Sequence, residues 1–279
     1  MANVISSIGI LDINYSSISL LDQLGQDYPN EVFYYLNDFS GTNFNEWTHK
    51  ALMDKIKEDV NLLLSYNPKL IIITGIEYIE YAKEYFDSIN IPTINIVDCV
   101  INNINNDYAK KNISLLIKST IHQTNLYQRE LNYGHYYVVN DDDLSRLVLF
   151  DKVKTEVSFD VVKKALADLN RKSVDLIVPT ICNASLLSTE FKEYLPKTAI
   201  LNTTVLLSKM VGKALSDNDL SKLKGKGEIN IIASSNDDLT QIKCLLKSKY
   251  CIKLKKENDK KTRIWKWKNT CLLLKLALC

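Results

Sequence analysis

Short apolar runs rich in β-branched residues alternate along this chain with longer segments of helical period, and this alternation limits the folds open to it. The runs predict strands, and the longer segments predict helices. The run at 70–74 is almost wholly apolar, which is typical of a central strand covered on both faces of a parallel sheet. The sequence therefore predicts βαβ units and the α/β fold class.

The same order of strands and helices occurs in each half of the chain. Two similar parallel-sheet α/β lobes explain this repetition most simply, with a ligand site in the inter-lobe cleft at the carboxyl ends of the strands. We expect a discontinuous first lobe at 1–98 and 206–279 and a second lobe at 99–205. The corresponding strands are expected at 8–12 and 70–74 in the first lobe, and at 112–117 and 175–179 in the second.

Further elements are expected around these strands. Additional strands are predicted at 31–36, 136–140 and 228–233. Helices are predicted at 18–24, 46–66, 123–131, 160–169, 205–215 and 238–247. The C-terminal stretch 263–279 carries two tryptophans and a leucine-rich end, and we interpret it as a terminal strand and helix on the core rather than a membrane-surface segment.

Composition and charge argue against several classes of function. Hydrophobic residues make up 46% and charged residues 24% of the chain, the balance of an ordinary globular protein. The net charge is +2, from 35 basic and 33 acidic residues, and gives no electrostatic argument for a nucleic-acid partner. The N-terminal sequence lacks a signal-peptide pattern, and no apolar run approaches the roughly 20 residues that span a bilayer. We therefore expect a cytoplasmic protein.

The six cysteines show no metal-binding pattern. They lie at 99, 182, 244, 251, 271 and 279, without CxxC spacing or a nearby histidine. The three histidines are isolated from one another in the sequence. We expect no metal site, and we expect Cys99 and Cys182 to be buried free thiols that pack as small apolar groups.

A series of segments follows in a characteristic order. The chain opens with IGILD at 8–12, SISLL at 17–21 and YPNEVFYY at 28–35. It continues with PKLIII at 68–73, IPTI at 91–94, NISLL at 112–116, Tyr127 and VDLIV at 174–178. In order and spacing, from about residue 4 to about residue 250, the chain resembles the glutamate racemases of the Asp/Glu racemase family. The resemblance implies a two-lobed α/β protein with its active site between the lobes and no cofactor.

Racemisation of glutamate needs a proton carrier on each face of the α-carbon. In the family two thiols serve as this acid–base pair. The first family motif, Cys-Asn-Thr, falls here on Gly75, Ile76 and Glu77. The resemblance therefore places no thiol at the first catalytic position.

The second family motif, Gly-Cys-Thr-His, aligns without gaps on residues 180–183. Its cysteine then falls on Ile181 and its histidine on Asn183, although a shift of one residue makes Cys182 the thiol. Opposite Cys182, the candidate at a motif position is Asp12, whose ordinary pKa is far from that of a thiol. The resemblance thus gives Cys182 and Asp12 as the candidate catalytic residues.

The substrate-holding motifs of the family are also altered. The N-terminal Asp-Ser-Gly keeps only Asp12 and continues with Ile13 and Asn14, and the Gly-Thr of the second lobe falls on residues 120–121. The Pro-Tyr-Gly loop falls on residues 43–45. By motif position, the residues expected to line the cleft are Asn14, Asn43, Phe44, Asn45, Gly75, Ile76, Glu77, Ile181 and Asn183.

Acidic residues offer another arrangement. Glu77, Asp98 and the run at 141–143 could assemble as paired carboxylates, but we interpret the run at 141–143 as a solvated loop.

Our leading hypothesis is a glutamate racemase-like protein without racemase activity, retained for binding a small ligand or a protein. A small amino acid or carboxylate is the expected ligand class, and a homodimer stays open. One alternative is an active racemase that supplies D-glutamate for the cell wall. The other is a single-cysteine decarboxylase-like enzyme, a class related to the racemases, in which Cys182 would protonate an enediolate.

Overall fold

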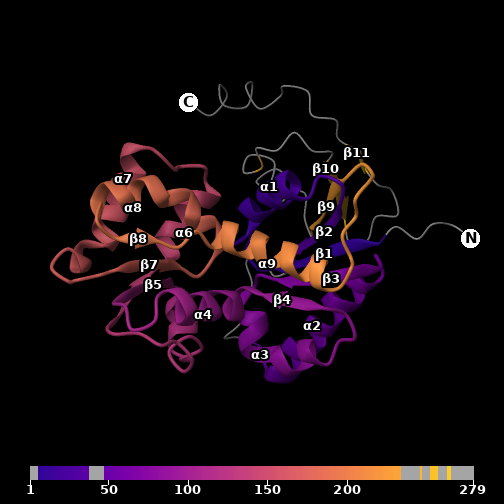
Figure 1. Ribbon diagram of the computed structural model, residues 1–279, viewed down its shortest axis with the longest axis horizontal. Helices are drawn as coiled ribbons and strands as arrows, with labels where there is room; N and C mark the ends of the chain where they lie inside the picture. The colour runs from indigo at the N-terminus through magenta and orange to yellow at the C-terminus, as the bar shows by residue number, and fades with distance from the viewer. Residues whose placement is uncertain (1–5, 38–46, 234–245, 247–251, 257–262, 265–279) are drawn as a thin grey trace, which may run out of the picture.

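Two β-sheets organise the chain in the computed structural model, which describes residues 6–37, 47–233, 246, 252–256 and 263–264 (Figure 1). The larger sheet has the order β11-β10-β9-β2-β1-β3-β4, and its pairs are parallel except for β10 with β11. In that order its strands are Arg263–Ile264, Ile252–Lys256, Glu228–Ala233, Val32–Asn37, Ser7–Asp12, Pro68–Ile73 and Thr93–Asn95.

The smaller sheet is parallel throughout and has the order β6-β5-β7-β8. Its strands are Tyr136–Asn140, Ile113–Ile117, Leu176–Pro179 and Ala199–Ile200. In each sheet the two central strands pair as expected, β1 with β3 and β5 with β7. The predicted fold class, two similar parallel-sheet α/β units, is confirmed. The lobe limits at 1–98, 99–205 and 206–279 stay a prediction.

Helices cover the sheets and join them (Figure 1). Helix α1 lies on one face of the seven-stranded sheet and α2 and α3 on the other, as right-handed crossovers require. Helix α9 runs between the two sheets and contacts both α1 and α4. The longer helices are α1 (Ile18–Asp27), α2 (His49–Leu64), α3 (Ile76–Asp87), α4 (Ile96–Asp107) and α9 (Thr203–Asp217). The shorter ones are α5 (Ser119–His122), α6 (Asp142–Leu149), α7 (Glu156–Ala165), α8 (Ser188–Tyr194) and the 3-10 segments η2 (Ala167–Leu169) and η3 (Cys182–Leu187).

The helix predicted at 123–131 is wrong. The structure forms only the single turn α5 before this segment and continues in turns to residue 130. Asn125 adopts φ 58°, and this left-handed conformation interrupts a right-handed helix. The apolar spacing around Tyr127 reflects burial of individual side chains in the core rather than a helical face.

The other predicted helices and strands within the described residues are present, and they differ from the prediction only in where they begin and end. The segment at 160–169 differs most, because α7 begins earlier, at a capping box in which Thr155 and Ser158 exchange hydrogen bonds, and then gives way to η2. The strand expected near 263 is present as β11. The helix predicted at 238–247 and the segment 265–279 lie outside the described residues, apart from Leu246.

The core lies where the central strands meet their helices. Ile10 of β1, Ile72 of β3 and Leu115 of β5 are fully buried, and all three belong to one apolar cluster that spans both sheets. Because the cluster reaches across the two sheets, the carboxyl ends of their strands are brought toward each other.

Candidate functional site

The carboxyl ends of β1 and β7 place Asp12 and Cys182 in one buried cluster. Both side chains are fully buried. The thiol of Cys182 hydrogen-bonds with Ser17 and Thr204, and the nearby charge of Asp12 contributes to its pKa. The structure therefore brings the two candidate catalytic residues together, but it leaves neither of them open to solvent.

Asp12 is held by four donors from three parts of the chain, namely β2, the segment after β3 and the turn before α1. Its Oδ1 accepts hydrogen bonds from Ser16 Oγ at 2.6 Å and Thr74 Oγ1 at 3.0 Å. Its Oδ2 accepts from the backbone N–H of Ser17 at 2.9 Å and from the hydroxyl of Tyr35. Burial raises the pKa of the Asp12 carboxyl above its ordinary value, while these hydrogen bonds act in the opposite direction. Both carboxylate oxygens are thus occupied by partners inside the protein.

The thiol of Cys182 is an unreactive form of cysteine. Burial raises the pKa of Cys182 to about 12, and the hydrogen bonds from Ser17 and Thr204 offset only part of this effect. Burial likewise raises the pKa of Cys99, in α4, to about 12. Because a thiol must lose its proton to act as a base, burial disfavours the basic form of both cysteines near pH 7. The prediction that Cys99 and Cys182 are buried free thiols is confirmed.

No side chain fits at the position of Gly75, between β3 and α3. An added Cβ would lie 2.7 Å from Cδ1 and Cγ1 of Ile13 and 2.6 Å from Cδ2 of Tyr78. Ile13 and Tyr78 are themselves buried, so neither can swing out into solvent. The next residue, Ile76, is also buried and packs in the apolar cluster.

Asn183 joins the two halves of the chain rather than facing a ligand. Its side-chain Oδ1 accepts the N–H of Ser19 at 2.9 Å, and its Nδ2 donates to the carbonyl of Tyr15. Its own N–H donates to the carbonyl of Ser16 at 3.0 Å. Asn183 and the adjacent Ile181 are both buried. The start of η3 is thereby fixed to the start of α1.

The turn after β1 contains two successive residues in the left-handed region. Asn14 has φ 53° and Tyr15 has φ 54°. Asparagine tolerates this conformation better than most residues with a side chain. The residue type at position 14 is therefore compatible with the turn that follows β1.

A charged cluster bridges the two sheets beside these residues. Lys118 follows β5, and its Nζ lies 3.1 Å from Oε1 of Glu77 in the first turn of α3. Asp141, directly after β6, is fully buried, and neither of its carboxylate oxygens accepts a hydrogen bond from another described residue. Lys118 is therefore paired with Glu77, and its charge also acts on the nearby Asp141. Asp98 instead pairs with Lys83 at 2.7 Å and takes no part.

The expectation that 141–143 is a solvated loop is wrong for Asp141. Asp142 and Asp143 are exposed in the first turn of α6, where acidic residues favour the helix N-terminus, but Asp141 precedes the helix and points inward. Burial raises the pKa of Asp141 to about 7, and the charge of Lys118 limits the rise.

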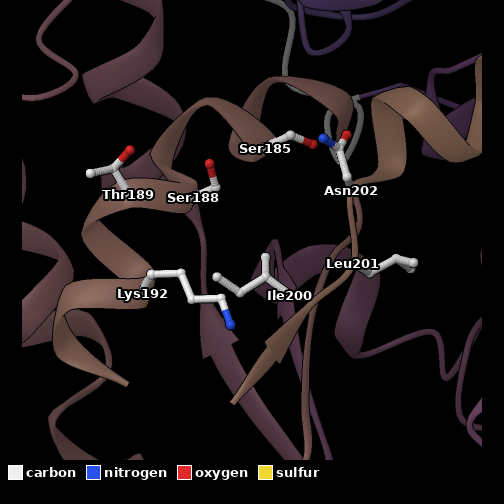
Figure 2. A pocket seen from close by; sticks show the side chains of 7 residues that line it. All are labelled: Ser185, Ser188, Thr189, Lys192, Ile200, Leu201 and Asn202. Carbon is white, nitrogen blue, oxygen red and sulfur yellow. The ribbon is translucent and has the colours of Figure 1, made fainter. Parts of the chain in front are cut away.

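A separate pocket of about 500 Å³ lies on the smaller sheet, among η3, α8 and β8 (Figure 2). Its lining is rich in hydroxyl groups and contains one lysine. The lining residues are Ser185, Ser188, Thr189, Lys192, Ile200, Leu201 and Asn202.

Two further observations concern only the described part of the chain. No group of three or more His, Cys, Asp or Glu side chains there could hold a metal ion. None of the helices described combines the length and apolar character needed to cross a bilayer. The predicted cleft residues Asn43, Phe44 and Asn45 lie outside the described residues.

No protein-family model and no curated relative matches the sequence. Solved structures do resemble the fold. Glutamate racemase from Thermus thermophilus, in complex with β-chloro-D-alanine, has a TM-score of 0.78 at 16% identity, over 91% of this chain and 97% of that one. Glutamate racemase from Francisella tularensis, in complex with D-glutamate, has a TM-score of 0.77 at 15% identity, over 90% and 97%. Aspartate racemase from Picrophilus torridus has a TM-score of 0.52 at 12% identity, over 76% and 95%.

The chain has the Asp/Glu racemase fold. Within that fold, five of the site positions predicted from the family motifs lie close to one another. Asp12, Cys182, Gly75, Glu77 and Asn183 lie at or between the carboxyl ends of β1, β3 and β7, as expected. Each of them is buried, and the four that carry a side chain direct it to a partner within the protein.

Sequence reasoning missed Lys118 and Tyr35, which complete this arrangement in the racemase fold. Lys118 directly follows β5, and ligand sites of parallel sheets lie at the carboxyl ends of their strands. The position of Lys118 after a predicted strand could therefore have marked it as a site residue. Tyr35 lies inside β2 and is fully buried, and its donation to Asp12 follows from the β1–β2 register. No local motif marks that contact.

Replacing Asn183 by Ala should lower the free energy of unfolding by about 2–4 kcal/mol, because it leaves the Ser19 N–H and the Tyr15 carbonyl buried without partners. Chemical denaturation followed by circular dichroism measures the change. Replacing the exposed Asn170 by Ala is the matched control and should change stability by less than about 0.5 kcal/mol. Equal effects of the two substitutions would contradict the joining role of Asn183.

Replacing Asp141 by Asn should remove a pH dependence of stability. The pKa of Asp141 is raised from 3.8 to about 7 on folding. Below pH 4 the carboxyl is protonated in both states, and as pH rises toward 7 only the unfolded chain releases the proton, so stability falls over this window. Above pH 7 the Asn variant should be more stable by on the order of a few kcal/mol.

The measurement is the free energy of unfolding of both proteins at a series of pH values from 4 to 9. Replacing the exposed Asp142 by Asn removes the same charge from the next position and serves as control. If the free energy of unfolding depends on pH in the same way for the Asp141 variant and the unchanged protein, the pKa of Asp141 is not raised by folding.

Proposed function

We propose that this racemase-fold protein does not racemise glutamate and that it has been retained for binding a small ligand. The observation that carries the proposal is the environment of Gly75. At the position of the family's first thiol, a side chain would overlap Ile13 and Tyr78 unless these buried side chains moved. One face of a bound amino acid would therefore lack a proton carrier.

The opposite face supports the same proposal. Among the residues that the structure describes, Cys182 is the candidate thiol there, and a pKa raised to about 12 favours its protonated form at neutral pH. In a working pair, one thiol must be a thiolate while the other is protonated. Asp12 cannot replace the missing partner from where it lies, because its two oxygens already accept four hydrogen bonds from the protein.

Charge in the crevice also argues against a dicarboxylate substrate. The Lys118 ammonium is paired with Glu77, and Asp141 lies nearby. Two acids against one lysine give this region a negative balance when all three are ionised. A dicarboxylate substrate would have to break the Lys118–Glu77 ion pair and bind beside the carboxylates of Glu77 and Asp141. This disfavours glutamate and aspartate.

The alternative of a single-cysteine decarboxylase uses Gly75 and Cys182 in the roles expected from the sequence. It requires a substrate to reach the Cys182 sulfur, which is fully buried. We further propose that the protein works in the cytoplasm, and its buried free thiols support a reducing compartment.

Purified protein incubated with L-glutamate or L-aspartate should form no D-isomer above the buffer blank when the products are separated by chiral chromatography. Incubation in D₂O sharpens the test, because exchange of the α-proton reports a single proton carrier even where no inversion occurs. We expect no exchange either.

The variant Cys182→Ala is the control for both measurements. Formation of the D-isomer that disappears in this variant would overturn the proposal. Exchange without inversion that disappears in the variant would favour a one-thiol enzyme of the decarboxylase type. A cooperative unfolding transition of each sample establishes that the protein tested is folded.

Introducing Gly75→Cys should not create a racemase and should lower stability by about 1–3 kcal/mol, because the new Cβ overlaps Ile13 and Tyr78. Combining it with Ile13→Ala should relieve part of this loss. A double-mutant cycle on the free energies of unfolding should therefore give a favourable coupling of about 1 kcal/mol or more. Strict additivity of the two changes would contradict the crowding at Gly75.

A further inference from the structure

The pocket among η3, α8 and β8 is distinct from the buried cluster between the sheets. Figure 2 shows Ser185, Ser188 and Thr189 along one side of the pocket and the side chains of Lys192 and Ile200 along the other. Its volume of about 500 Å³ lies in the range of small-molecule sites. None of the lining residues belongs to the Asp12 and Cys182 cluster.

The pocket presents hydrogen-bond donors whose orientation is fixed from outside. Asn202 is the N-cap of α9, and its Oδ1 accepts the N–H of Val205 at 3.1 Å. With the oxygen held by the helix, the amide Nδ2 is directed away from it and remains a donor. Lys192 donates one hydrogen to the carbonyl of Thr198 at 2.8 Å, which leaves two ammonium hydrogens for a ligand.

The charge of the pocket has one sign. Lys192 is the only ionisable residue in the lining, and no carboxylate stands there to neutralise it. The nearby acid Glu190 is buried and turned away, since its Oε1 accepts from Ser158 Oγ at 2.8 Å and from the Lys154 N–H. The pocket therefore favours an anion.

An apolar part completes the lining. Ile200 is half-buried in β8, and Leu201, directly after it, is almost fully buried. A purely inorganic anion would leave this apolar surface in contact with water, whereas an aliphatic group would cover it. The lining thus combines one cation, an amide, three hydroxyl groups and an aliphatic wall.

We propose that this pocket binds a small organic monoanion, a carboxylate with an aliphatic portion. The carboxylate would pair with the Lys192 ammonium and the aliphatic portion would pack on Ile200, while the Asn202 amide lies toward the other end of the pocket. The proposal stands apart from the fate of the crevice between the sheets, because the two sites share no residue.

Isovalerate is the smallest convenient probe that has both features, and titration followed by NMR chemical shifts measures its dissociation constant. We expect binding in the millimolar range and about fivefold weaker binding of the neutral isostere isovaleramide, as one partly exposed ion pair allows. Inorganic phosphate, which has charge but no apolar part, should bind more weakly than isovalerate. Equal affinity of isovalerate and isovaleramide would overturn the proposal.

Two variants locate the binding. Lys192→Gln should abolish the preference for isovalerate over isovaleramide, and the exposed Lys163→Gln on α7 makes the same change of charge outside the pocket as its control. Asn202→Asp keeps a side chain that caps α9 while placing a negative charge in the pocket, and should weaken isovalerate about tenfold. Its control is Asn170→Asp, at an exposed position that does not line the pocket.

The results decide the matter in either direction. Loss of the isovalerate preference in the two pocket variants, with the two controls unchanged, supports the site. Equal loss in variants and controls would mean that the anion responds only to net charge, and this would overturn it. The chemical shifts give a second criterion, since those of Ser185 and of the residues of α8 should change and those of Asp12 and Cys182 should not.

Discussion

The buried carboxylate of Asp12 is the interaction on which the surrounding structure depends. A carboxylate taken out of water is unfavourable unless hydrogen bonds replace its hydration, and Asp12 receives four of them. The donors come from β2, from the segment after β3 and from the turn that begins α1. The acid therefore fixes the relative positions of three elements at the point where, by resemblance, a racemase binds its substrate. The protein itself supplies the partners that a ligand would otherwise provide.

Much of this fold could be predicted from the sequence because its strands are short apolar runs that are poorly compatible with another kind of secondary structure. β3 is buried on both faces, so its sequence is almost wholly apolar. Such a run predicts a central parallel strand without any tertiary information. The segment at 123–131 could not be predicted in the same way. Its apolar residues repeat at a helical spacing, but Asn125 takes a left-handed conformation in the folded chain, and asparagine is compatible with either state.

The candidate site was predictable in position and less so in content. The resemblance located Asp12, Gly75 and Cys182, since each follows a recognisable strand. It gave no indication of Lys118 or of the inward turn of Asp141, because an acidic run before a helix looks the same whether its first member is solvated or buried. Such contacts join residues far apart in the sequence, here Glu77 with Lys118. Only the packing of the two sheets decides them.

The backbone around Asn14 and Tyr15 links the end of β1 to the rest of the molecule. Two successive residues at positive φ are unfavourable and persist only where neighbouring contacts hold them. Here the Tyr15 N–H donates to Asn37 Oδ1 at 2.9 Å, and the Tyr15 carbonyl accepts from Asn183. The same turn presents Ser16 and Ser17 to Asp12. Through Asn183 and Asp12, this turn joins the two halves of the molecule.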